Sequence, residues 1–143
     1  MSTSGYSGTP LAKKLGIKSE FKVKLIGEPG YYLTLFTDLP TNVYFVANKE
    51  SPVNLIHFFT KTNAELLFQL PELKQQITQD GIIWVSWPKK ASKVVTDITE
   101  DKIRDYALQI GLVDIKVCAV DEIWSGLKLV IPVKNRINVN YKP

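Results

Sequence analysis

The fold class of this chain is decided by residues 82–90, which read Ile-Ile-Trp-Val-Ser-Trp-Pro-Lys-Lys. Five β-forming or small residues predict a short strand over 82–86, which runs into the loop that begins Trp87-Pro88. A helix is predicted next, capped by Asp97 or Thr99, and then two strands over 113–120 and 127–133. The short loop between those last strands predicts an antiparallel hairpin. This order of elements is typical of the end of a doubly wound α/β sheet.

The upstream sequence shows the same alternation of strands and helices. Strands are predicted over residues 21–26, 43–47 and 53–59, and helices over 9–15, 31–37 and 62–79. Thr9 is the expected N-cap of the first helix, with Pro10 at its first position. The pair Thr62 and Glu65 forms a capping box for the third, in which Pro71 predicts a kink or a division into two short helices. We therefore expect a three-layer, Rossmann-like α/β sandwich of about six mostly parallel strands with a C-terminal antiparallel hairpin.

Length and composition predict one soluble domain. The 143 residues, of which 45% are hydrophobic and 22% charged, fit a single domain over 1–143, with a flexible segment at 1–8 and a polar tail at 134–143. No apolar run approaches the roughly 18 residues of a membrane helix. The first residues do not resemble a secretory signal, so we expect no membrane association and a cytoplasmic location. Cys118 is the only cysteine and fits a buried strand better than a reactive site.

The charge balance limits the partners that the sequence predicts. The net charge of +4 is mildly basic, so weak attraction to anions is expected. Basic residues do not alternate with aromatic ones, and specific nucleic-acid binding is therefore not expected. His57 is the only histidine and lies within an apolar strand, where it is either a hydrogen-bonded core residue or a ligand. Too few ligand residues cluster to predict a metal site.

Ligands of open α/β sheets bind beyond the carboxyl ends of the strands, and the first such loop is Gly27-Glu28-Pro29-Gly30. It lacks the G-x-G-x-x-G spacing of a dinucleotide-binding loop and is not a P-loop. Two interpretations remain open, an ordinary turn or a cofactor loop built on Gly27 and Gly30. Glu50 follows the second strand, where it is either a surface residue or a partner for a ribose.

Two later loops carry the other candidate residues, and they leave neighbouring strands. The first holds lysines that suit a phosphate or carboxylate before a helix N-terminus, and the second holds carboxylates and a stacking surface. The candidate ligand-binding residues are Ser86, Trp87, Lys89, Lys90, Asp121, Glu122, Trp124 and Ser125. The alternative is that both loops are solvated turns over packed tryptophans.

Four stretches of the chain resemble a bacterial family called domain of unknown function 3052. They are GYSGTPLAKKLGI at 5–17, WVSWPKK at 84–90, GLVDIKVCAVDE at 111–122 and WSGLKLV at 124–130. The resemblance spans residue 5 to about residue 130. It implies no particular activity, because the family is defined without one.

The order of elements is also similar, at the level of the fold, to class I methyltransferases that use S-adenosylmethionine. Those enzymes have a glycine-rich loop after the first strand, an acidic residue at the end of the second and a closing antiparallel hairpin. The hairpin matches here, whereas the glycine-rich loop departs from the pattern and one strand–helix unit is missing. The leading hypothesis is a small domain that binds an anionic small molecule or a protein partner. The alternatives are a reduced methyltransferase-like enzyme and a structural protein without a ligand site.

Overall fold

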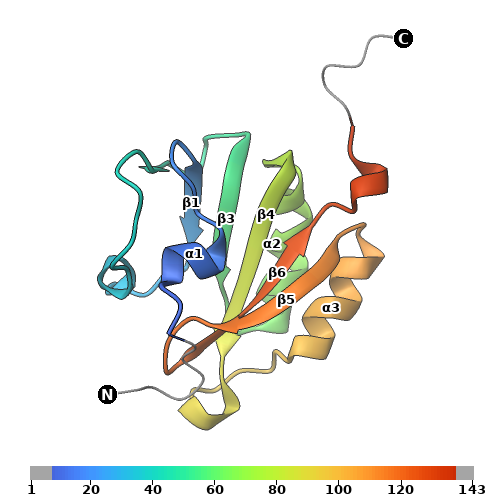
Figure 1. Ribbon diagram of the computed structural model, residues 1–143. Coiled ribbons are helices and arrows are strands. Elements are labelled where there is room, and N and C mark those ends of the chain that lie inside the picture. Colours follow the sequence, from blue (N-terminus) through green and yellow to red (C-terminus); the bar gives the residue numbers. More distant parts are fainter. Residues whose placement is uncertain (1–7, 138–143) are drawn as a thin grey trace.

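The computed structural model describes residues 8–137 as one six-stranded sheet with helices on both faces (Figure 1). Most of the segment predicted as flexible, residues 1–7, and the tail from 138 lie outside the described residues. The strands are β1 (Lys22–Ile26), β2 (Tyr44–Phe45), β3 (Val53–Phe59), β4 (Ile77–Pro88), β5 (Val113–Ala119) and β6 (Trp124–Val130). The helices are α1 (Leu11–Leu15), α2 (Asn63–Lys74) and α3 (Glu100–Gln109), and the 3-10 turns are η1 (Tyr32–Leu35), η2 (Lys90–Ser92) and η3 (Val133–Asn135).

The strands lie in the order β2-β1-β3-β4-β6-β5. Neighbours from β2 to β4 are parallel, and β6 is antiparallel to both β4 and β5. This confirms the predicted mixed sheet with its closing hairpin. Helices α2 and α3 cover one face, called the α2–α3 face below, and α1 with η1 lies on the other, the α1 face (Figure 1).

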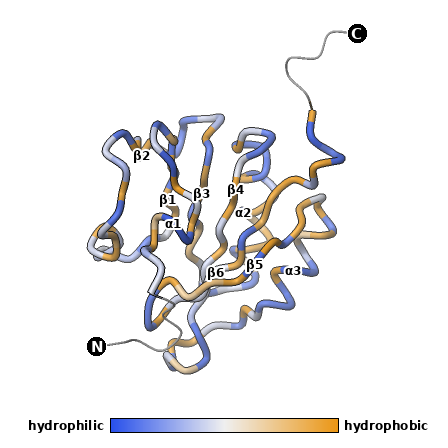
Figure 2. The backbone as a smooth tube through the Cα atoms, viewed as in Figure 1, coloured by the Kyte–Doolittle hydropathy of each residue, from blue (hydrophilic) through white to orange (hydrophobic). Residues whose placement is uncertain are grey.

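Each face of the sheet packs its own hydrophobic core, because side chains alternate between the faces along every strand. On the α2–α3 face Ile56 and Phe58 of β3 meet Leu66 and Leu70 of α2. On the α1 face the fully buried Trp84 donates a hydrogen bond from its indole nitrogen to the Leu15 carbonyl, at 2.9 Å. In Figure 2 the hydrophobic colour follows the strands, and the hydrophilic colour is concentrated in the loops at the ends of the sheet.

The boundary between α2 and β4 differs from the prediction. The helix ends at Lys74 and Ile77 already belongs to β4, so extension of the helix to residue 79 was wrong. The Val53 N–H donates to the Gln76 carbonyl at 2.8 Å, and Ile77 pairs with Val53. Hydrogen bonding to β3 therefore determines the conformation of these residues, although their sequence favours a helix. Pro71 lies inside one continuous helix, and the predicted division into two helices was also wrong.

The start of α1 is capped by a distant residue rather than by the predicted Thr9. Pro10 occupies the N-cap position, which offers no side-chain acceptor. The Asp38 carboxylate instead accepts hydrogen bonds from the Ala12 and Lys13 N–H groups, both at 3.1 Å. A carboxylate at a helix N-terminus satisfies free N–H groups and interacts favourably with the helix dipole. This contact holds the loop after η1 against α1.

The other boundaries changed less. Residues 32–35 form a 3-10 turn instead of a helix over 31–37, and β2 spans two residues instead of five. β6 begins at Trp124, earlier than predicted, and ends at Val130 before Pro132. Thr62 and Thr99 cap α2 and α3 by accepting hydrogen bonds from the Glu65 and Lys102 N–H groups.

A polar chain of three side chains crosses the core of the α1 face. The hydroxyl oxygen of Tyr32 lies 2.9 Å from His57 Nδ1, and Ser86 Oγ lies 2.8 Å from His57 Nε2. All three residues are buried, and the His57 ring stacks on Phe59 with 4.2 Å between ring centroids. A neutral imidazole donates at one nitrogen and accepts at the other, so both hydrogen bonds are satisfied without a charge. This arrangement supports the core interpretation of His57.

We expect the stability of the protein to fall as the pH drops from 7 to 5. Burial lowers the pKa of His57 from 6.5 to about 3. Below pH 6.5 the unfolded chain therefore binds a proton that the folded chain does not, and the free energy of unfolding decreases by about 2 kcal/mol in total over this window. Urea denaturation at several pH values measures the effect. His57→Gln should flatten the curve, and a parent protein without any slope here would contradict the interpretation.

Candidate functional site

A cleft opens between the end of β1 and the residues that follow β2. Its volume is about 470 Å³, and we call it the Gly27 cleft. It is lined by Leu25, Ile26, Gly27, Glu28, Phe45, Val46, Ala47 and Asn48. Most of the lining residues are of apolar type, but backbone groups, Glu28 and Asn48 make the exposed lining surface more polar than apolar. Phe45 is 40% exposed. Such a composition suits a small molecule with a flat apolar part and a few polar groups.

Gly27 shapes this cleft through its backbone. Its φ of 69° is in the left-handed region, and a Cβ there would lie 2.4 Å from the Phe59 carbonyl oxygen. Only glycine can bring the chain this close to β3 while turning it away from β1. Gly30 differs, because nothing lies within 4 Å of a Cβ built on it, and it is absent from the cleft lining. Of the two candidate cofactor glycines, the structure brings Gly27 alone to the cleft.

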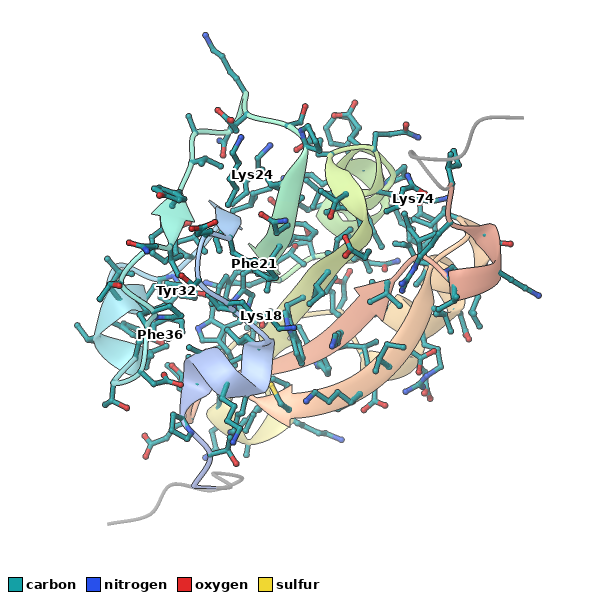
Figure 3. The ribbon with its side chains drawn as sticks, turned by 45° about the horizontal axis from the view of Figure 1, so that its top comes forward. Lys18, Phe21, Lys24, Tyr32, Phe36 and Lys74 are labelled. Carbon is teal, nitrogen blue, oxygen red and sulfur yellow. The ribbon has the colours of Figure 1, made fainter. Side chains whose placement is uncertain are left out.

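Lys24 supports the far wall of the cleft, and the sequence did not identify it. It is 1% exposed, and its ammonium donates to the Asn48 carbonyl at 2.8 Å and to Gln76 Oε1 at 2.6 Å. Burial lowers its pKa, and the nearby Glu50 charge acts in the opposite direction. Figure 3 shows Lys24 near the start of β3. Lys24 lies in the strand predicted over 21–26, and it is buried because β1 is covered on both faces.

Glu50, the proposed ribose partner, lies elsewhere. Its carboxylate forms an ion pair with Lys22 at 2.9 Å, at the opposite end of β1 from Gly27. It does not line the Gly27 cleft, where Glu28 and Asn48 provide the polar side chains. Of the two interpretations of Glu50, this position favours the surface residue.

The lysine loop and the loop before β6 do lie side by side. Pro88 pairs with Trp124, and the Lys89 N–H donates to the Ile123 carbonyl at 2.7 Å. Their tryptophans nevertheless point to opposite faces, since Trp87 packs in the α2–α3 core and Trp124 in the α1 core. Ser86 is fully buried beside His57, and Ser125 is half-buried on β6.

The Asp121 carboxylate organises its own turn. One oxygen accepts hydrogen bonds from the Ile123 and Trp124 N–H groups at 2.8 and 2.7 Å, and the other accepts from the Tyr31 hydroxyl at 2.8 Å. Burial and this carboxylate raise the pKa of Tyr31 to about 12. Glu122 beside it is exposed. Asp121 thus ties the loop before β6 to the segment that follows the Gly27 cleft.

A second cavity, of about 530 Å³, lies on the other side of the lysine loop. Trp87, Lys90 and Lys93 line it together with the residues that lead into α3. Lys89 and the residues of the 121–125 loop are not part of its lining. Two acidic residues, Glu100 and Asp101, occupy the first turn of α3 and reduce the attraction of that helix end for anions.

The described residues also bear on metal binding, membrane spanning and the reactivity of the cysteine. Within residues 8–137 no three His, Cys, Asp or Glu side chains gather as metal ligands. No helix in the same range is long and apolar enough to cross a membrane. Cys118 is half-buried, and burial raises the pKa of its thiol despite the nearby lysines.

Known structures share this arrangement at low sequence identity. A protein from Sulfolobus solfataricus described as a type 11 methyltransferase superimposes with a TM-score of 0.60 and 16% identity, over 92% of this chain and 95% of its own. The ribosomal protein L11 methylase of Lactobacillus delbrueckii gives a TM-score of 0.55 and 14% identity, over 84% and 74%. Fibrillarin of Methanococcus jannaschii, a pre-rRNA processing protein, gives 0.52 and 9%, over 80% and 68%.

These similarities establish a methyltransferase-like, Rossmann-type fold. No protein-family model and no curated protein matches the sequence, so the resemblance to domain of unknown function 3052 stays a prediction.

Gly27→Ala should destabilise the protein by about 2–4 kcal/mol, because alanine adds strain at positive φ and a contact with rigid backbone. Gly30→Ala is the matched control and should change stability by less than about 1 kcal/mol. Urea denaturation of both variants gives the comparison. Equal effects at the two glycines would contradict the role assigned to Gly27.

Proposed function

We propose that this chain is a methyltransferase-type protein that binds S-adenosylmethionine in the Gly27 cleft. The position of the cleft carries the proposal. The chain leaves β1 toward β2 and leaves β3 toward β4, in opposite directions across the sheet, so the switch point lies between β1 and β3. The cleft, between the ends of β1 and β2, adjoins it through Gly27, whose backbone lies against the Phe59 carbonyl of β3. Open α/β sheets bind ligands outside the carboxyl ends of the strands at such a switch point. The methyltransferase names among the structural neighbours agree with this function but show the fold alone.

The cleft residues fit the adenosine part of the cofactor. A volume of about 470 Å³ lies within the usual range for small-molecule pockets. Phe45, half exposed at the edge, offers an aromatic face to a purine ring, and Val46 and Ala47 extend the apolar surface. Glu28 accepts hydrogen bonds from ribose hydroxyls, and Asn48 both donates and accepts. When bound, the cofactor supplies an activated methyl group for transfer to an acceptor.

Lys24 is a positioning residue in this proposal. Its ammonium fixes the Asn48 carbonyl, and the amide of Asn48 faces the cleft from the same short loop. The lysine is buried with neutral hydrogen-bond acceptors, so its contacts restrict the loop without placing a charge in the cleft. The role assigned to Lys24 is therefore to hold the cleft open in the absence of a helix between β1 and β2.

Binding is tested by thermal shift and calorimetry with S-adenosylmethionine and S-adenosylhomocysteine. A ligand at 100 times its Kd should raise stability by about 2.7 kcal/mol. Ala47→Phe fills the cleft at an exposed position and should abolish the shift without lowering the melting temperature of the free protein. Ala91→Phe, also exposed and outside the cleft, is the control and should bind normally. Absence of binding by the parent protein would refute the proposal.

A second candidate function rests on the cavity between Lys90 and Lys93. It corresponds to the binding of an anionic small molecule, with Trp87 as one wall of the cavity. Two lysines converging on one depression support it, whereas the acidic first turn of α3 weakens it.

Under this candidate, pyrophosphate should raise the melting temperature of the parent protein. The Lys90→Ala, Lys93→Ala double variant should lose that shift, because it removes both cations from the cavity. Lys49→Ala, Lys134→Ala makes the same change of net charge at exposed positions outside the cavity lining and should retain the shift. A shift that both double variants lose equally would reflect net charge and count against this site.

A further inference from the structure

On the α1 face, the middle of β6 and β5 around Lys128 has no helix over it, whereas Trp124 at the start of β6 packs in the α1 core. We call this uncovered middle part the bare side. In Figure 1 α1 lies in front of the half of the sheet that contains β1 and β3, and it meets β5 at the end of that strand, where Lys14 donates to the Ala119 carbonyl. Within residues 8–137 no helix lies over the middle of β6 and β5 on this side. Leu127 and Leu129 of β6 are buried in the core of the opposite face. Lys128, between them in sequence, therefore points to the bare side.

Three lysines converge on this surface. Lys116 of β5 pairs directly with Lys128 of β6, and Lys18 approaches from the loop after α1, where Figure 3 shows it in front of the sheet. Partial burial and the charges of Lys116 and Lys18 lower the pKa of Lys128. Across residues 8–137, no carboxylate lies within ion-pair distance of these three lysines. We call Lys18, Lys116 and Lys128 the lysine face.

This arrangement is unfavourable for the isolated protein. Like charges directly opposite on neighbouring strands destabilise a sheet. The carboxylate of Asp114, on the same strand as Lys116, is engaged together with Glu100 and Asp101 by Arg104 of α3. The repulsion can therefore be relieved by an anion that comes from outside the chain.

The surface continues as a cationic strip along β5. Lys14 and Lys89, together with Lys116, lie close enough to Cys118 that their charges affect the pKa of its thiol. The Lys14 ammonium donates to the Ala119 carbonyl at 3.0 Å, which places it at the end of the same strand. Lysines are thus spread from the middle of β5 to its carboxyl end. A row of point charges matches a chain of phosphates better than one isolated anion.

The chemistry of the face favours a nucleic acid over a membrane. Membrane-binding surfaces combine cations with exposed large apolar side chains. The other residues that β5 and β6 direct to this side, Val113, Cys118, Gly126 and Val130, are half-buried or buried. Two apolar residues of β5 are exposed: Ile115, in the bulge beside Lys116, and Val117, which pairs with Leu127 and lies on the opposite face.

We propose that the lysine face binds the phosphate backbone of a nucleic acid without reading its sequence. This is consistent with the absence of a predicted sequence-specific interface. It is independent of S-adenosylmethionine binding, since the Gly27 cleft lies at β1 and β2, near the other edge of the sheet. Lysine ammonium groups neutralise phosphates as point charges and make no bidentate contact with bases, so affinity depends on charge and salt.

Fluorescence anisotropy with a labelled mixed-sequence oligonucleotide, single-stranded and duplex, tests the proposal between about 50 and 200 mM salt. Lys116→Gln, Lys128→Gln should raise Kd about tenfold and reduce the slope of log K against log salt by about 1.4 on a single strand, for two lost phosphate contacts. Lys61→Gln, Lys134→Gln has the same net charge and should bind like the parent. The first variant should also melt at the same or a higher temperature, because it removes a repulsion.

Each outcome of this experiment either supports or overturns nucleic-acid binding at the lysine face. Loss of affinity confined to the Lys116→Gln, Lys128→Gln variant supports the proposal. No binding by the parent protein overturns it, as does equal weakening of both double variants, which would indicate a net-charge effect. Binding to phosphatidylserine vesicles without binding to either oligonucleotide would overturn it in favour of a membrane surface.

Discussion

The geometry of this fold depends on a neutral imidazole in the middle of the sheet. His57 sits between Tyr32 and Ser86 and is out of contact with water, so both ring nitrogens must find partners inside the protein. The partner on one side is the neighbouring strand β4, and the partner on the other is η1. The single histidine therefore connects the central strand pair to the segment that follows the Gly27 loop. An apolar residue at position 57 could pack there but could not specify where Tyr32 lies.

The two proposed surfaces occur where the fold omits a helix. The connection from β1 to β2 contains only a 3-10 turn, so the end of β1 stays open and the Gly27 cleft forms beside it. At the other edge, β6 returns through a short hairpin, which needs no crossover helix. The middle of β5 and β6 is left uncovered on the α1 face and carries lysines. The positions of both proposed surfaces thus follow from how the strands are connected.

Much of this architecture could be read from the sequence because it rests on local signals. The apolar run at 53–59 gave a strand with the predicted bounds, and Thr62 caps α2 as its spacing from Glu65 indicated. Of the two caps predicted for α3, Asp97 or Thr99, the structure has Thr99. The mixed sheet followed from the short connection before β6. The errors came from long-range contacts that no local pattern encodes. Asp38 caps α1 from 26 positions away, and pairing with Val53 draws Ile77 into β4.

The candidate site was less accessible to sequence reasoning, for the same reason. Loops were placed at the correct end of the sheet, but the faces to which their side chains point depend on register. Trp87 and Trp124 lie on adjacent strands and enter different cores. Lys24 lies in a strand in which lysines alternate with apolar residues. Its burial could not be predicted from that pattern, because it depends on the cover over both faces of β1.

The position of β6 also governs the order in which the molecule can be assembled. β5 touches the sheet only through β6, which follows it in the chain and inserts between it and β4. During synthesis, β5 therefore leaves the ribosome without a strand partner. It can pair only after β6, which ends at Val130, has also emerged. The parallel half of the sheet can pair while translation continues, whereas the half that bears the lysines forms in one late step.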